Sequence, residues 1–155
     1  HHLKEEELDP FLAAAEIVAY APGEKIVSQG EAGDFLFAIV QGKADVSFKD
    51  LNDDEMFVSS FGAGEIFGEA AIFTTEKRTA SVTCAEPAQI LRIHKNDLVG
   101  YIKEHPRAGN KILMTIILSL LKKLKKANQE LAFEKQSDID FNYADSLIRD
   151  FMNDI

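Results

Sequence analysis

The stretch from Ile17 to Phe67 restricts the fold more than any other part of the chain. Short β-branched or aromatic segments alternate there with turn signals at nearly even spacing. The turn signals are Pro22-Gly23, Gly30 to Asp34, Gln41-Gly42, Asn52-Asp53-Asp54 and Gly62-Ala63-Gly64. Many short strands at even spacing indicate a β-sandwich or a β-roll.

Helices are expected on both sides of this β region. Leu8 to Glu16 favours a short N-terminal helix, with a proline in its first turn and an alanine-rich body. Thr79 to Ala85 and Gln89 to His94 are predicted as two further strands. The hydrophobic period then changes, which predicts a helix over Asn96 to Glu104 and a long helix over about residues 106–135. The expected class is α+β.

The segment from Phe67 to Cys84 carries the chemistry of a phosphate site. Gly68 has no side chain, so its backbone can approach a ligand closely. The residues after Glu69 suit a single helical turn, whose free N–H groups and positive dipole end favour an anion. Arg78 adds a permanent cation with a planar donor fork, and Thr79 adds a hydroxyl donor. Together these features predict a phosphate clamp.

Glu69 narrows the ligand further. A carboxylate beside a phosphate repels it unless the carboxylate has a hydrogen-bond donor of its own to bind, and a ribose hydroxyl is such a donor. A 3′,5′-cyclic nucleotide combines a phosphate of low charge with a free 2′-hydroxyl. This ligand class therefore fits the residue set best.

Two segments now resemble a known family. The run from Phe67 to Cys84, with its Gly-Glu, small residue and Arg-Thr-Ala, resembles the phosphate-binding cassette of cyclic-nucleotide-binding domains. Ile26 to Gly42 resembles the other glycine-marked signature of that family, except at Ala38, where the family favours a larger apolar residue. Either segment alone could be a loop and a strand edge whose arginine pairs with a surface carboxylate. Both together, in the right order, are far more specific.

The resemblance extends from about Pro10 to about Phe133 and is strongest to the bacterial catabolite-activator branch. It implies an antiparallel β-roll, of the double-stranded β-helix or jelly-roll type, with an N-terminal helix, a short cassette helix and a long C-terminal dimerisation helix. Residues 1–136 would form the nucleotide-binding domain and residues 137–155 a separate tail. The residues expected to bind the ligand are Val46, Val58, Ser59, Phe67, Gly68, Glu69, Ala70, Ala71, Arg78, Thr79, Ala80, Lys123 and Asn128.

Several of these residues have a second interpretation from sequence alone. Val46 and Val58 fall on apolar phases of their strands, so ordinary core packing is as good an account as ligand contact. Ser59 could bond a base edge or cap a strand. Thr79 occurs both in bacterial cyclic-AMP sensors and in domains that prefer cyclic GMP, so it does not decide the base.

The two candidates on the long helix also have two interpretations. Lys123 belongs to a cluster of lysines whose default role is a solvated helix face, yet the family often has an arginine there that lies near the cassette carboxylate. Lys123 could therefore pair with Glu69 or with the ribose. Asn128 could meet the adenine amino group or remain an ordinary surface residue. Asn128 and the bacterial character of the helix favour cyclic AMP over cyclic GMP.

The long helix carries a heptad seam, which predicts an interface. Its members recur with alternating spacings of four and three: Leu113, Ile117, Leu120, Leu124, Ala127 and Leu131. The resembling family uses this helix to form a homodimer, and we predict a parallel homodimer through residues 106–135.

The tail over residues 137–155 is acidic and amphipathic. Its apolar stripe consists of Phe141, Leu147, Ile148, Phe151, Met152 and Ile155. Asp138 or Asp140 is expected to cap this helix. Because Arg149 is its only basic residue, the tail is not a DNA-reading element. We expect it to pack back on the domain or to dock on a protein effector.

Charge and composition exclude several classes. The formal net charge of −9 over 155 residues opposes nonspecific nucleic-acid binding. The apolar run Ile112 to Leu121 is too short to cross a bilayer, and His1-His2 has the look of a purification-tag remnant rather than a leader. These features predict a cytoplasmic chain without a membrane span.

Cysteine and histidine usage speaks against a cofactor. The single cysteine, Cys84, allows no internal disulfide and no cysteine-ligated iron–sulfur cluster, and is expected to be a buried apolar thiol. His94 and His105 are isolated from other metal-ligand residues. We therefore expect no metal, no cofactor other than the nucleotide ligand, and no catalytic residues.

The leading hypothesis is a non-catalytic cyclic-nucleotide sensor that transmits ligand binding through its C-terminal helices. The alternative is that the chain is the sensor fragment of a longer transcription regulator or cyclic-nucleotide-gated channel. An enzyme or metal-binding β-roll of the cupin kind needs clustered histidines with a carboxylate, which the sequence lacks, and is a remote third.

Overall fold

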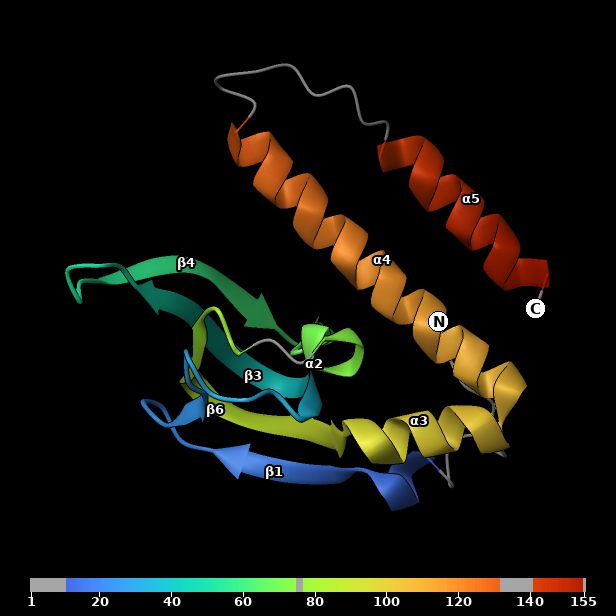
Figure 1. Ribbon diagram of the computed structural model, residues 1–155, viewed down its shortest axis with the longest axis horizontal. Helices are drawn as coiled ribbons and strands as arrows, with labels where there is room; N and C mark the ends of the chain where they lie inside the picture. Colours follow the sequence, from blue (N-terminus) through green and yellow to red (C-terminus); the bar gives the residue numbers. More distant parts are fainter. Residues whose placement is uncertain (1–10, 75–76, 132–140, 155) are drawn as a thin grey trace. The chain divides into compact units, whose positions relative to one another are not determined.

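The structure is a computed structural model that describes residues 11–74, 77–131 and 141–154 (Figure 1). The chain divides into two compact units, one ending at Gly100 and one whose continuous part begins at Tyr101; they are called here the β unit and the helical unit. The elements are β1 (Glu16–Tyr20), β2 (Lys25–Val27), β3 (Phe35–Lys49), β4 (Glu55–Gly62), β5 (Ile66–Phe67), α2 (Ala70–Phe73), β6 (Ser81–His94), α3 (Lys95–Glu104), α4 (Pro106–Leu131) and α5 (Phe141–Asp154).

The β unit is built on one antiparallel sheet, which confirms the predicted β-roll class. Its described strands form a 6-stranded sheet in the order β1-β6-β3-β4, with β2 added to β6 and β5 added to β3. The buried core contains Val27, Phe37, Ile39, Ala44, Phe67, Val82, Cys84, Ala88 and Ile90. Residues from β2, β3, β5 and β6 therefore close over one apolar interior.

The predicted turn at Gln41-Gly42 is wrong, and so is the division of Thr79–Ala85 from Gln89–His94. β3 runs through Gly42 as one strand, and β6 is likewise continuous. Gly42 has φ +99°, and a Cβ built there would lie 2.5 Å from the Pro87 carbonyl oxygen. The pairing register of β3 with β6 shifts on both sides of this point. Gly42 and Pro87 thus mark an irregularity inside two long strands, and these residue types are the ones that permit such an irregularity.

The helix predictions are confirmed, with different bounds at the described ends. In the described part of the N-terminal segment, residues 11–14 are helical and strand β1 already begins at Glu16, so the predicted extension of the helix to Glu16 is wrong. α3 begins at Lys95, one residue before its predicted start, and α4 ends at Leu131, the last described residue before 132–140. The proposed caps Asp138 and Asp140 lie outside the described residues.

In the helical unit, α5 packs against α4, in line with the first of the two expectations for the tail, while docking on a protein effector stays a prediction. Met152 on α5 is buried, while Leu147 and Phe151 on the same helix remain about half exposed. On α4 the seam residues stay open, with exposed fractions of 38% for Ile117, 40% for Leu120 and 51% for Leu124. At these three positions α5 therefore leaves the seam of α4 uncovered. None of the described helices is both long and apolar enough to cross a membrane.

Candidate functional site

Arg78 is the centre of the candidate site, and its backbone is fixed by the loop between β2 and β3. The Arg78 amide donates a hydrogen bond to the Glu31 carbonyl oxygen at 2.7 Å, and the Gly30 amide donates to the Arg78 carbonyl oxygen at 2.8 Å. An isolated bridge between Ala32 and Lys77 continues this pairing. The structure thus joins the two segments that sequence analysis had identified separately.

The guanidinium of Arg78 points back toward the start of β3. Its Nη2 atom donates a hydrogen bond to the Phe35 carbonyl oxygen at 2.9 Å, and its Cζ atom lies 5.9 Å from the centroid of the Phe37 ring. A guanidinium has five N–H donors in a planar fork, and this bond uses one of them. The remaining geometry suits recognition of a planar or tetrahedral anion.

Two glycines lie against the same guanidinium. Gly68 has φ +80°, and a Cβ built there would lie 2.8 Å from the Phe35 carbonyl oxygen and 3.0 Å from Arg78 Nη1. A Cβ at Gly33 would lie 2.6 Å from Arg78 Nε and 2.7 Å from Cζ. The close approach predicted at Gly68 is therefore to the arginine and the β3 backbone. Sequence analysis missed Gly33, although it lies inside the second signature.

Carboxylates surround the cation. Burial lowers the pKa of the Arg78 guanidinium from its usual value, and the charges of Asp34, Glu31 and Glu69 oppose that shift. Arginine remains protonated in proteins in spite of such burial. Glu69 is itself only 5% exposed, and Asp34 lies 3.5 Å from the Lys95 ammonium group. The site therefore holds a half-buried positive charge inside an acidic neighbourhood.

The predicted cassette turn is present as α2, a single turn of four residues. Glu69 occupies its N-cap position in a right-handed helical conformation and makes no side-chain cap hydrogen bond. Its carboxylate is therefore not used to close the helix. Ala70 and Thr79 are exposed and Ala80 is half-buried, whereas the side chain of Ala71 lies outside the described residues.

An aromatic stack supports the site from below. The Phe67 ring lies between Phe37, at 4.9 Å and 9° between planes, and Phe61, at 5.5 Å and 7°. Phe67 is 3% exposed, so it acts here as a core residue that holds Phe37 beneath the arginine. Stacked rings of this kind add to the stability of the packing beyond their buried area.

The other predicted pocket residues of the sheet differ in pairing and in exposure. Val46 and Ser59 face each other across β3 and β4, are half-buried, and Val46 packs against the core that contains Phe67. Val58 lies at the register shift of this pair and is 47% exposed. Val46 and Ser59 thus lie opposite each other, whereas Val58 has no partner in the β3–β4 register.

Lys123 and Asn128 lie on α4 in the helical unit, and both are half-buried. The predicted approach of these two side chains to Glu69, the ribose or the base stays a prediction.

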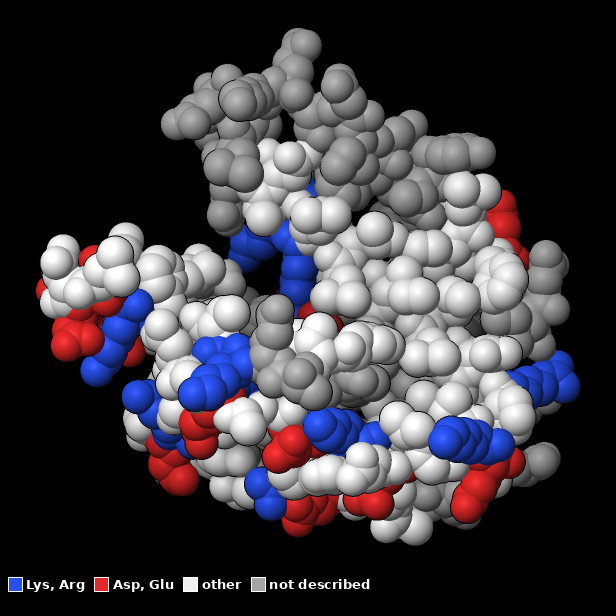
Figure 2. Space-filling model, in the orientation of Figure 1, with Lys and Arg blue, Asp and Glu red and all other residues white. Residues whose placement is uncertain are grey.

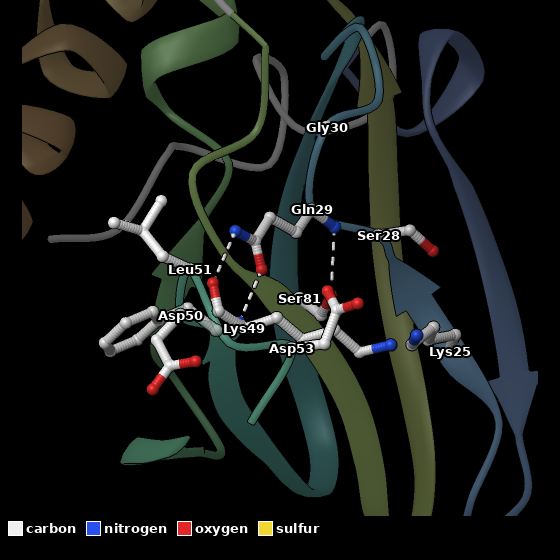
Figure 3. A pocket seen from close by; sticks show the side chains of 10 residues that line it. Lys25, Ser28, Gln29, Gly30, Lys49, Asp50, Leu51, Asp53 and Ser81 are labelled. Carbon is white, nitrogen blue, oxygen red and sulfur yellow. Dashed lines mark hydrogen bonds between the residues drawn. The ribbon is translucent and has the colours of Figure 1, made fainter. Parts of the chain in front are cut away.

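A separate hollow lies between the β2–β3 loop and the turn that joins β3 to β4 (Figure 3). It is lined by Lys25, Ser28, Gln29, Gly30, Phe48, Lys49, Asp50, Leu51, Asp53 and Ser81, none of which was predicted to bind the ligand. The Gln29 side chain accepts a bond from the Lys49 amide at 2.7 Å and donates to its carbonyl oxygen at 3.3 Å. The Gln29 amide donates to Ser81 Oγ at 2.9 Å. Gln29 thus ties the loop that holds Arg78 to two other strands.

Neither the surface charge in this view nor the described metal-ligand residues indicate a second kind of site. Along the lower edge of Figure 2, Lys and Arg side chains alternate with Asp and Glu side chains instead of forming one basic patch. Within residues 11–74, 77–131 and 141–154, no group of three or more His, Cys, Asp or Glu side chains is arranged to hold a metal ion.

Residues 17–105 match the protein family described as "Cyclic nucleotide-binding domain". The chain is 28% identical over 131 residues to the cyclic AMP receptor protein of Thermus thermophilus, covering 84% of this chain and 59% of that protein. It is also 34% identical over 94 residues to a cGMP-dependent protein kinase of Eimeria tenella, covering 61% of this chain and 9% of the kinase.

The solved structure of the Thermus thermophilus catabolite activator protein has the same fold. It aligns with a TM-score of 0.72 at 27% identity, over 86% of this chain and 61% of that chain. The present chain therefore spans about three fifths of the length of these bacterial relatives.

Proposed function

Since the chain belongs to the cyclic nucleotide-binding domain family, we propose that it binds a 3′,5′-cyclic mononucleotide and serves as a regulatory sensor with no catalytic activity of its own. The family resemblance stated from the two signatures is confirmed by the match over residues 17–105. The ligand residues, the identity of the base and the route of the signal are the proposal.

The observation that carries the proposal is the placement of Arg78. Its guanidinium is fixed by the Phe35 carbonyl and lies against Gly33 and Gly68, while three carboxylates lie within electrostatic range. One cation among carboxylates favours an anion of single charge and disfavours a polyanion. A cyclic phosphodiester carries one negative charge, whereas a nucleoside triphosphate carries several.

Glu69 supplies the second part of the recognition. It is buried beside the arginine and is not used as a helix cap. We propose that its carboxylate accepts a hydrogen bond from the ribose 2′-hydroxyl, while Arg78 and the exposed Thr79 donate to the phosphate. The backbone of Gly68, Ala70, Ala71 and Ala80 would line the phosphate and ribose.

Cyclic AMP is the proposed ligand in preference to cyclic GMP. The matched receptor protein of Thermus thermophilus is named for cyclic AMP and is matched over more of this chain than the kinase named for cyclic GMP. In this proposal Val46, Val58, Ser59 and Phe67 form the base side of the pocket. Asn128 would meet the adenine amino group, and Lys123 would pair with Glu69 or the ribose.

The proposed output runs through the helical unit. The exposed seam of α4 would form a parallel homodimer, and the α5 face with Leu147 and Phe151 would contact a protein effector. Residues 1–136 would act as the nucleotide-binding part and 137–155 as the output tail, in the cytoplasm and without direct contact to nucleic acid. Because the chain spans 59% of the matched receptor protein, a sensor part of a longer transcription regulator or channel is the second candidate.

Calorimetric titration with cyclic AMP and cyclic GMP tests the proposal on the native chain and on Arg78→Ala. We expect micromolar or tighter binding of cyclic AMP, weaker binding of cyclic GMP, and a loss of about 2–3 kcal/mol in Arg78→Ala, as for a charge-assisted hydrogen bond in a desolvated site. Lys43→Ala is a matched control because Lys43 is an exposed cation on β3, in the same β unit.

Each outcome has a clear meaning. If neither nucleotide binds the native chain below about millimolar concentration, an affinity of only some −4 kcal/mol, the sensor proposal is wrong. If cyclic AMP binds and Arg78→Ala binds it almost as well, the phosphate clamp is wrong although the ligand is right. A loss in Lys43→Ala equal to that in Arg78→Ala would point to general destabilisation.

A further inference from the structure

We propose that Gly33 is a positioning residue for the nucleotide phosphate: its missing side chain leaves the space in which the Arg78 guanidinium is held ready for the ligand. This inference rests on the proposed function, because it assigns a role at the same site. It concerns a residue outside the cassette, in the loop that precedes β3.

The backbone at Gly33 does not explain why glycine is there. Among the glycines with positive φ are Gly30, Gly42 and Gly68, and Gly33 is not one of them. A left-handed backbone is therefore not the reason for glycine at this position. The reason that the structure does show is space.

The space at Gly33 is taken by one side chain. The three nearest atoms to a Cβ built there all belong to the Arg78 guanidinium: Nε at 2.6 Å, Cζ at 2.7 Å and Nη2 at 3.1 Å. A Cβ at such distances forces one partner to move, and the end of an arginine side chain moves at much lower cost than a backbone. Alanine at position 33 should therefore leave the fold intact and displace the guanidinium.

The guanidinium has little freedom to be displaced and still bind in the same way. Its opposite edge lies against Gly68, where a Cβ would be 3.0 Å from Nη1, and its Nη2 is bonded to the Phe35 carbonyl. Gly33, Gly68 and Phe35 thus enclose the planar group from three sides. A donor fork fixed before the ligand arrives loses less conformational entropy on binding than a mobile one.

The test is a double-mutant cycle of Gly33→Ala with Arg78→Ala, with cyclic AMP affinity measured by calorimetry. We expect Gly33→Ala to bind roughly tenfold to a hundredfold more weakly than the native chain, as when a charge-assisted contact is lost. In the Arg78→Ala background the same substitution should change affinity by less than about twofold, because independent sites add and coupled ones do not. Gly62→Ala is the matched control, since Gly62 has no positive φ and no atom within 4 Å of a built Cβ.

A readout that does not need a ligand separates this inference from the proposed function. The Nε–H resonance of Arg78, assigned from its absence in Arg78→Lys, should shift in Gly33→Ala and stay in place in Gly62→Ala, because the Phe37 ring acts on a fixed guanidinium. If the native chain binds no cyclic nucleotide but the resonance shifts as expected, the proposed ligand is wrong and the positioning of Arg78 by Gly33 is right.

Three results would overturn the inference. The first is native affinity and an unmoved resonance in Gly33→Ala. The second is an equal loss of affinity from Gly33→Ala with and without Arg78, which would show a structural role unrelated to the arginine. The third applies if Gly33→Ala fails to fold: the double variant, which lacks the clash, should then recover folding, and a double variant that stays unfolded contradicts the proposal.

Discussion

The region around Arg78 and the outer face of α4 solve opposite problems. Around Arg78, small residues let a half-buried cation lie close to carboxylates and to the Phe35 carbonyl, and these groups belong to the β unit. On α4, large apolar side chains at Ile117, Leu120 and Leu124 remain exposed in the described structure. The first region is a compact polar cluster within the β unit, and the second is an uncovered apolar stripe.

This difference shows what kind of partner each region requires. A charged small molecule is recognised by a few fixed polar groups, and in the proposal most of them come from the β unit, with Lys123 and Asn128 added from α4. An apolar stripe at heptad spacing gains free energy only when a second apolar surface covers it. The following predictions probe the two regions in turn, from the largest expected effect to the smallest.

Replacing the seam should abolish the predicted homodimer. Leu120→Lys with Leu124→Lys puts charges at positions where each buried leucine would contribute about 1.5–3 kcal/mol, in both chains of the dimer. Light scattering at micromolar concentration should show a dimer for the native chain and a monomer for the double variant. Gln129→Lys, at an exposed position of α4 outside the seam, is the control and should remain dimeric. A strictly monomeric native chain, with and without ligand, removes the dimer from the proposal.

Gly68→Ala should damage the β unit itself. Here glycine is required twice, because φ is +80° and because a Cβ would meet the Phe35 carbonyl at 2.8 Å, which is backbone and cannot swing away. We expect a loss of about 3 kcal/mol in the free energy of unfolding, from backbone strain and overpacking together. Urea denaturation measures it, with Gly62→Ala within about 0.5 kcal/mol of the native chain. Equal stability of the two alanine variants would show that the turn before α2 is adaptable.

The contrast between Gly68 and Gly42 shows how far the sequence could lead. Both were marked as glycines with a local role, and both have positive φ. At Gly68 a distinctive sequence around the glycine identified a cassette turn, which the structure contains. At Gly42 the same kind of signal predicted a turn, because nothing local distinguishes a turn from an irregularity inside a long strand. The pairing of β3 with β6, which decides the matter, joins residues far apart in the chain, such as Gln41 with Gln89.

The same limit applies to the site. Arg78, Glu69 and Gly68 could be predicted because they lie within one short segment whose chemistry is self-explanatory. The contribution of Gly33 and of the Phe35 carbonyl could not be predicted, since it depends on where the arginine side chain turns after the β2–β3 loop has paired with the cassette. Periodicity predicted α3, α4 and α5 well, because helix faces repeat within the segment itself.

Glu69→Gln should sharpen the assignment of the ribose contact. The substitution keeps the size of a residue that is 5% exposed and removes only its charge. We expect cyclic AMP to bind about tenfold more weakly, close to 1.4 kcal/mol, because a charge-assisted hydrogen bond becomes a neutral one. The 2′-deoxy analogue, which lacks the donor, should lose much less on the same substitution. Equal losses for both ligands would instead assign Glu69 to the support of Arg78.

The smallest effect concerns Cys84, which probes how tightly the interior of the β unit is closed compared with the open seam of α4. Its thiol is 2% exposed and donates to the Glu86 carbonyl oxygen at 2.8 Å. Burial, and then the charge of Glu24, raises the pKa of this thiol above its usual 9.0. The unfolded chain therefore releases the proton first as the pH rises.

This order of proton release fixes the sign of the pH dependence. The contribution of the neutral thiol is fully present below about pH 9.0 and is lost as the pH rises toward the folded pKa, at about 1.4 kcal/mol for each unit that separates the two. Cys84→Ala lacks this titration, so the native chain should lose more stability than the variant between pH 8 and pH 10 in urea denaturation. Subtracting the two curves cancels the other titrating groups. If the difference in unfolding free energy between the two proteins did not change with pH, the Cys84 thiol would be in contact with water in the folded chain. The interior of the β unit would then be open to solvent, as the seam of α4 is.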